Sequence, residues 1–136
     1  MFQINHVKPD KFNLQEYLDF FAARRFPSVA EESQLSSLKE RIEQTVRSQF
    51  QNYITDVIVA TQDRGIVGSL FLGVMDHFVL IDEYDPTVKE MERQDAIALA
   101  LIAKTKEIAI SHDRDYIRLF LGGINKERLI DPFFQR

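Results

Sequence analysis

Hydrophobic and polar residues follow regular spacings along the chain, and these spacings divide it into helices and strands. Residues 2–7 alternate, with Phe2, Ile4 and His6 on one side, which predicts a short strand that ends before Pro9. The chain therefore opens with a strand.

Two helices are predicted next. Asn13 followed by Glu16 resembles a capping box, and the helix that it opens ends near Pro27. Its apolar positions, spaced i, i+3, i+4 and i+7, are Leu14, Tyr17, Leu18 and Phe21. The second helix begins near Ser28 or Glu31. Its apolar stripe consists of Leu35, Leu38, Ile42, Val46, Phe50 and Tyr53.

Strands are predicted from residue 56 onward. Segments 56–61 and 65–74 are predicted strands, and the Gln-Asp-Arg-Gly turn at 62–65 joins them into an antiparallel hairpin. A third strand, 77–84, ends before Pro86.

A long helix over 93–112 and a nearly all-apolar strand over 116–121 follow. Asn125 could cap a last short helix that carries Leu129, Ile130 and Phe133. The predicted order is β-α-α-β-β-β-α-β-α. Because a helix joins 77–84 to 116–121, we expect these two strands to be parallel neighbours in a mixed, mostly antiparallel sheet flanked by helices. We find no repeat or linker, so residues 1–136 are interpreted as one α/β domain.

Composition narrows the function classes. The chain has no cysteine, which excludes a disulfide framework and thiolate metal sites, and its three histidines are too far apart to form a metal-binding pair. A formal charge of −4 argues against nucleic acid as the main partner. No apolar stretch is long enough to span a membrane, and the first residues do not resemble a secretion signal, so we expect a cytoplasmic protein.

The element order and three segments resemble the GCN5-related N-acetyltransferases, which are acyl-CoA N-acyltransferases. Segment 61–70 (Thr-Gln-Asp-Arg-Gly-Ile-Val-Gly-Ser-Leu) is similar to the turn and glycine-containing strand of that family. Segment 93–98 (Arg-Gln-Asp-Ala-Ile-Ala) is similar to its acyl-CoA signature. Asn125 with Phe133 and Phe134 resembles its last motif.

The resemblance implies binding of acetyl-CoA or another acyl-CoA, with no metal. The pyrophosphate would lie at a helix N-terminus, where backbone N–H groups and the helix dipole favour an anion. By the resemblance, the residues of this cradle are Arg93, Gln94, Asp95, Ala96, Ile97 and Ala98, with Asn125 as a further contact. The pantetheine arm would enter a gap between the two parallel strands and pair with the backbone of Ile81, Asp82 and Tyr84.

The family's chemistry is direct attack of an amine on the thioester, with a carboxylate or a water taking the proton. Glu83 is the candidate base by this resemblance, with Asp82 beside it, because strand alternation points one of the two toward the cleft. A solvated acidic strand end is the simpler interpretation of this pair. Likewise, Arg93 could form a surface ion pair, and Asn125 could act only as a helix cap.

Several positions depart from the family pattern. Ala96 replaces a glycine, and Phe134 stands where a tyrosine is usual. Residues 85–95 carry four carboxylates against two cations, a net charge of −2 where a pyrophosphate prefers the opposite sign. We also expect Asp95, at the start of the helix, to satisfy the dipole itself and compete with phosphate.

The chain ends at Arg136, where that family continues with two more strands. Strand 116–121 is therefore expected to present an unpaired edge, which a second copy of the chain or another protein would cover. Two hypotheses follow: an acetyl-CoA-dependent N-acyltransferase acting on an unknown amine, or a non-catalytic protein of the same fold that serves in binding or assembly. An unrelated α/β domain with this element order is a third interpretation.

Overall fold

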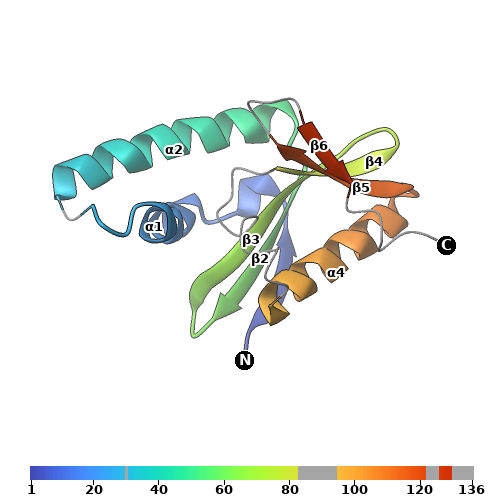
Figure 1. Ribbon diagram of the computed structural model, residues 1–136, viewed down its shortest axis with the longest axis horizontal. Helices are drawn as coiled ribbons and strands as arrows, with labels where there is room; N and C mark the ends of the chain where they lie inside the picture. Colours follow the sequence, from blue (N-terminus) through green and yellow to red (C-terminus); the bar gives the residue numbers. More distant parts are fainter. Residues whose placement is uncertain (30, 83–94, 122–125, 130–136) are drawn as a thin grey trace.

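The protein is built on one mixed sheet, seen in a computed structural model that describes residues 1–29, 31–82, 95–121 and 126–129 (Figure 1). Within these residues the sheet has six strands in the order β1-β2-β3-β4-β5-β6. Their bounds are β1 Gln3–Val7, β2 Asp56–Gln62, β3 Gly65–Val74, β4 Phe78–Asp82, β5 Tyr116–Leu121 and β6 Lys126–Leu129. Adjacent strands in sequence are adjacent in the sheet, which confirms the mixed, mostly antiparallel architecture.

The β4–β5 pair is parallel, as the intervening helix predicts, and its register runs from Phe78↔Tyr116 to Asp82↔Phe120. The other pairs of neighbouring strands are antiparallel. The β2–β3 hairpin turns at Asp63 and Arg64, whose positive φ angles of 52° and 68° are typical of a tight hairpin turn.

Helices cover both faces of the sheet (Figure 1). A short 3₁₀ turn, η1, covers Pro9–Lys11, and the helices are α1 Leu14–Arg25, α2 Glu32–Asn52 and α4 Ala96–Ser111. The predicted cap of the first helix is confirmed, since the side chain of Asn13 accepts a hydrogen bond from the Glu16 N–H at 3.2 Å. None of the helices among the described residues has the length and apolarity needed to cross a membrane.

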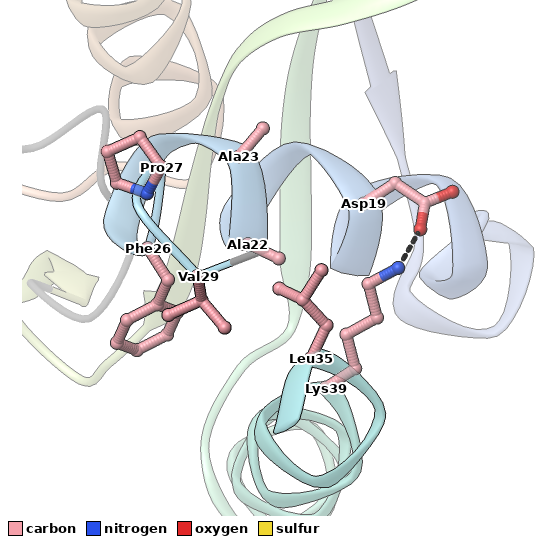
Figure 2. A pocket seen from close by; sticks show the side chains of 8 residues that line it. All are labelled: Asp19, Ala22, Ala23, Phe26, Pro27, Val29, Leu35 and Lys39. Atoms are coloured by element: carbon pink, nitrogen blue, oxygen red, sulfur yellow. Dashed lines mark hydrogen bonds and ion pairs between the residues drawn. The ribbon is translucent and has the colours of Figure 1, made fainter. Parts of the chain in front are cut away.

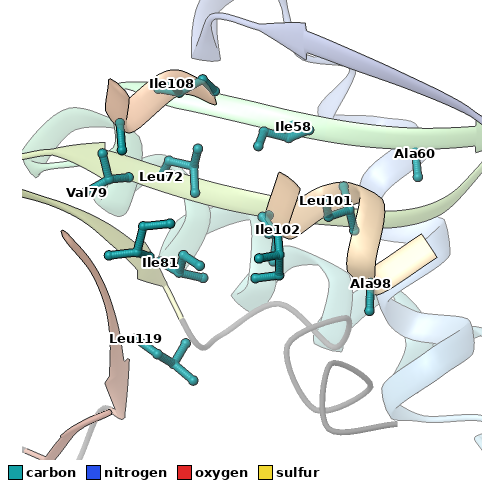
Figure 3. Close-up of a cluster of buried hydrophobic side chains, with 13 residues drawn as sticks. Ile58, Ala60, Leu72, Val79, Ile81, Ala98, Leu101, Ile102, Ile108 and Leu119 are labelled. Carbon is teal, nitrogen blue, oxygen red and sulfur yellow. The ribbon is translucent and has the colours of Figure 1, made fainter. Parts of the chain in front are cut away.

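Strand alternation divides the core into two layers. Along β2, Ile58 and Ala60 face α4, whereas Val57 and Val59 face α1 and α2. Figure 3 shows the first layer, in which Leu101 and Ile102 of α4 pack on the sheet. The residues drawn there are buried. Because α4 covers this face and α1 and α2 cover the other, the sheet is the middle of three layers.

The predicted last helix is wrong over residues 126–129. Residues 126–129, which were expected to follow a cap at Asn125, form β6 and pair antiparallel with β5 from Arg118↔Leu129 to Leu121↔Lys126. The physical reason is that a helix of a few residues has little stability of its own, whereas an adjacent unpaired strand offers a full set of backbone partners. Asn125 itself lies outside the described residues, as do Ile130, Phe133 and Phe134.

The same pairing corrects the expectation of an open edge. Between Arg118 and Phe120 the backbone of β5 is paired with β4 on one side and with β6 on the other. A partner that needs an unpaired β5 edge therefore finds none over this stretch.

Candidate functional site

The carboxyl end of β4 carries a buried acidic side chain. Asp82 is only 3% exposed, and its Oδ2 accepts a hydrogen bond from the phenol of Tyr53, the residue that directly follows α2. Buried carboxylates are rare unless they are hydrogen-bonded or paired with charge. This pair joins the end of α2 to the end of β4 on the face of the sheet that α1 and α2 cover.

The phenol of Tyr53 is held in its protonated form. Burial raises the pKa of Tyr53 well above its ordinary range, and the hydrogen bond to Asp82 and the negative charge of Asp82 act in the same direction. A hydrogen bond from Gln49 has a smaller, opposite effect on this pKa. Tyr53 therefore acts as a donor to Asp82 at any ordinary pH.

The N-terminus of α4 lies where the sequence predicts the phosphate cradle. Asp95 is the N-cap residue, and its Oδ1 accepts a hydrogen bond from the Ala98 N–H at 2.9 Å. This confirms that Asp95 satisfies the start of the helix itself. Ala96 is exposed, Ile97 is half-buried and Ala98 is buried. The N–H groups of Ala96 and Ile97 have no acceptor within the helix, as at any helix start.

The gap expected between the two parallel strands is not found over Phe78–Asp82. Ile81 aligns with Leu72 of β3 on one side and with Leu119 of β5 on the other, and Asp82 aligns with Phe120 of β5. The backbone of Ile81 is therefore already aligned in two ladders and is not free to pair with a pantetheine arm, whereas Asp82 lies beyond the end of the β3 ladder. Within the described residues, β4 and β5 form an unbroken parallel pair.

The other predicted site residues lie outside the described residues. These are Glu83, Tyr84, Arg93, Gln94 and Asn125. The structure thus places two predicted groups: Ile81 and Asp82 at the end of β4, and Asp95 to Ala98 at the start of α4. In the described part of the chain, no group of three or more histidine and acidic side chains is arranged to hold a metal ion.

The sequence did not point to Tyr53 as a site residue. Its position at the end of the apolar stripe of the second helix predicted a core side chain, and its ring does contact the α1 and α2 layer of the core. The contact with Asp82 joins residues 29 positions apart. The one signal for this role in the sequence is a tyrosine at the end of an amphipathic helix, because a buried tyrosine hydroxyl needs a hydrogen-bond partner.

A hollow of about 320 Å³ lies between the end of α1 and the start of α2 (Figure 2). Its wall is mostly apolar, including Ala22, Phe26 and Leu35, and the exposed ion pair between Asp19 and Lys39 closes one side at 2.7 Å. Tyr53 follows Leu35 by 18 residues, about 27 Å along a helix. The hollow is therefore separate from the Tyr53–Asp82 pair.

No family model and no curated protein matches the sequence, whereas several solved structures match the fold. PaiA N-acetyltransferase from Thermoplasma acidophilum, solved in complex with coenzyme A, is 18% identical, with a TM-score of 0.52 over 93% of this chain and 82% of its own. A proposed acetyl transferase from Pyrococcus furiosus is 19% identical, with a TM-score of 0.59 over 88% and 83%.

A GCN5-related N-acetyltransferase from Ralstonia eutropha is 12% identical, with a TM-score of 0.54 over 91% of this chain and 86% of its own. Identities this low carry the fold and not the activity. The shared arrangement extends over about nine tenths of the chain. The chain has the fold of the GCN5-related N-acetyltransferases.

Proposed function

We propose that this protein is an N-acyltransferase that moves an acyl group, acetyl in the simplest case, from coenzyme A to an amine. The observation that carries the proposal is the match of nearly the whole chain to the fold of acetyltransferases, one of them solved in complex with coenzyme A. By the family resemblance, the pyrophosphate would lie at the start of α4.

In the described part of the cradle, the backbone suits a pyrophosphate, whereas the charge of the side chain opposes one. Two first-turn N–H groups, of Ala96 and Ile97, and the small side chain at position 96 allow a phosphate to approach. The carboxylate of Asp95 bonds to the Ala98 N–H and repels an anion at the same helix end. Together, these two effects favour binding of acyl-CoA that is weaker than it would be with an uncharged cap residue.

Bound acyl-CoA supplies a thioester, whose carbonyl carbon accepts a nucleophile. The acidic end of β4, where Asp82 precedes Glu83, supplies a carboxylate that takes one proton from the acceptor ammonium. The freed amine forms the new C–N bond, the C–S bond breaks, and the second amine proton goes to the leaving sulfur. The products are the amide and the free thiol, with one proton left on the protein.

Calorimetric titration with acetyl-CoA tests the proposal most directly. We expect the wild type to bind and Asp95→Asn to bind several-fold more tightly. Asparagine keeps the cap, while removal of one nearby negative charge is worth about 1 kcal/mol. Asp63→Asn, in the β2–β3 turn, makes the same chemical change at a distant helix-free position and should leave the affinity unchanged. Absence of binding at millimolar acetyl-CoA in all three proteins would contradict the proposal.

A non-catalytic protein of the same fold is the second candidate. Two observations favour it: Asp95 already occupies an N–H of the anion site, and β4 and β5 are closed from Phe78 to Asp82. This candidate requires that neither the wild type nor Asp95→Asn binds acetyl-CoA. The titration above therefore separates the two functions in one experiment.

A further inference from the structure

The segment that carries Tyr53 is fixed against the sheet. Its own N–H and that of Ile54 both donate to the Gln49 carbonyl, at 3.0 and 2.9 Å, which ends α2. The next N–H, of Thr55, donates to the Leu72 carbonyl of β3 at 2.8 Å. The backbone is thus held on both sides of Tyr53, and the ring itself packs against the α1 and α2 layer of the core, so its hydroxyl has a defined position.

Close packing against β3 fixes this segment further. A Cβ atom placed on Gly73 would lie 2.7 Å from the carbonyl oxygen of Tyr53, so only glycine allows the two backbones to approach this closely. The Val74 N–H donates to the Thr55 hydroxyl at 3.0 Å and adds another link between the same segments. The α2–β2 junction is therefore a rigid support rather than a free loop.

The acceptor of the phenol is equally well placed. Asp82 is the last residue of β4, a strand paired on both sides, and it is 3% exposed. A carboxylate at the end of a rigid strand and a phenol on a rigid junction make a preorganised hydrogen bond. Asp82 directly precedes Glu83 in the sequence, at the strand end where the proposed reaction needs its proton acceptor.

We propose that Tyr53 is a positioning residue for acyl transfer: its phenol holds the carboxylate of Asp82 in the orientation in which it takes a proton from the acceptor ammonium. This inference rests on the proposed acyltransferase function. In the step itself, one proton moves from the ammonium nitrogen to the Asp82 carboxylate, and the resulting amine attacks the thioester carbonyl. The phenol keeps its own proton throughout.

Two features argue for orientation rather than proton transfer by Tyr53. Burial and the neighbouring carboxylate raise the pKa of Tyr53, so the phenol is a poor acid and is already protonated. Its proton is also committed to Asp82 Oδ2. A donor of this kind restricts the rotation of the carboxylate, and misplacement of a reacting group by about 1 Å can cost on the order of 100-fold in rate.

The test is steady-state kinetics with acetyl-CoA and three primary amines: a lysine peptide, spermidine and an aminoglycoside. The release of the free thiol of coenzyme A is the measured signal. Tyr53→Phe removes only the hydroxyl. We expect kcat to fall by about 10- to 100-fold while KM and the calorimetric Kd for acetyl-CoA stay within about twofold. Tyr116→Phe is the matched control, because that ring stacks on Phe78 at 5.4 Å and should leave kcat unchanged.

Asp82→Asn keeps a hydrogen-bond acceptor for Tyr53 and removes the proton acceptor, so it guards against a failure of Tyr53→Phe to fold. We expect a large fall in kcat with an unchanged Kd for acetyl-CoA. Adding Tyr53→Phe to Asp82→Asn should cause no further fall, since a positioning residue acts only through its partner. An additive fall in the double variant would overturn the inference.

The outcomes distinguish a failure of this inference from a failure of the proposed function. If the wild type transfers acetyl groups and Tyr53→Phe has an unchanged kcat, the inference is wrong and the proposed function stands. If Tyr53→Phe weakens the binding of acetyl-CoA and also lowers the melting temperature and kcat, Tyr53 is only structural and the inference is again wrong. If the wild type acetylates none of the amines and binds no acetyl-CoA, the proposed function falls and the inference falls with it.

Discussion

Oδ1 of Asp56 lies 2.8 Å from the ammonium nitrogen of Lys8, and this ion pair ties the start of β2 to the residue that follows β1. Asp56 is 1% exposed, whereas the side chain of Lys8 is 61% exposed. The same oxygen lies 2.7 Å from Nε2 of His6, and Thr55 donates to Oδ2 at 2.7 Å. A buried carboxylate with this many partners is an important local contribution to the edge of the sheet.

Asp56→Asn should destabilise the protein. The amide can replace only part of the accepting capacity of the carboxylate, and buried donors and acceptors that lose their partners cost about 1–3 kcal/mol. We expect urea unfolding to show a loss of this size. Asp19→Asn is the control, because Asp19 is 71% exposed and its pair with Lys39 is worth no more than about 1 kcal/mol. Equal losses in the two variants would show that the burial of Asp56 contributes nothing.

The contribution of Asp56 should depend on pH. Burial alone raises the pKa of Asp56, but hydrogen bonds from Lys8, Thr55 and His6, with the charge of Lys8, outweigh it and hold the pKa below its ordinary value of 3.8. A carboxyl group with a lowered pKa stabilises the fold above its unfolded pKa, and that stability is lost as the pH falls through the folded value. The difference between wild type and Asp56→Asn should therefore be full near pH 7 and shrink below about pH 4. A difference that stays constant on acidification would contradict this assignment.

The sequence was sufficient for those features that local physics decides. The Asn13 cap, the hairpin turn at Asp63 and Arg64, and the parallel β4–β5 pair were all predicted and are found. Each depends on residues close in sequence, or on a crossover helix whose handedness leaves few alternatives. The cap that the Asp95 side chain makes at the start of α4 belongs to the same class.

Long-range pairing decided the features that the sequence analysis missed. Residues 126–129, Lys-Glu-Arg-Leu, favour a helix by intrinsic propensity, and pairing with the edge of β5 makes them a strand instead. Tyr53 and Asp82 belong to different elements, and the apolar stripe of α2 gives no indication of which polar group meets the phenol. The contact between His6 and Asp56 spans 50 residues and depends on the register of β1 with β2.

Asp95→Ala should lower the stability of α4 by about 1 kcal/mol, because it removes the side-chain acceptor of the Ala98 N–H at the N-cap. Asp95→Asn should lose much less, since asparagine is an equally good cap residue. Thermal unfolding of the two variants measures the difference. If both variants are as stable as the wild type, the cap bond is not formed in solution. In that case Asp95 would offer no competition to a phosphate.

Gly73→Ala should be among the more damaging single-methyl substitutions in the protein. The added Cβ would lie 2.7 Å from the Tyr53 carbonyl oxygen and 2.9 Å from the Met75 methyl carbon. The methionine side chain can move aside, but the carbonyl belongs to a backbone held by hydrogen bonds to Gln49 and β3. Overpacking of this kind costs about 1–3 kcal/mol, and urea unfolding should show a loss in that range.

Gly65→Ala is the matched control for the Gly73 substitution, because it adds the same methyl group to the same strand. Its nearest neighbour would be the Gln62 carbonyl oxygen at 3.7 Å, an ordinary contact, so we expect a change within about 0.5 kcal/mol. The Gly73 variant should also push Tyr53 away from Asp82, whereas the Gly65 variant lies at the far end of β3 and should not. If Gly73→Ala were as stable as Gly65→Ala, the junction would be able to yield, and the rigid support proposed for Tyr53 would be wrong.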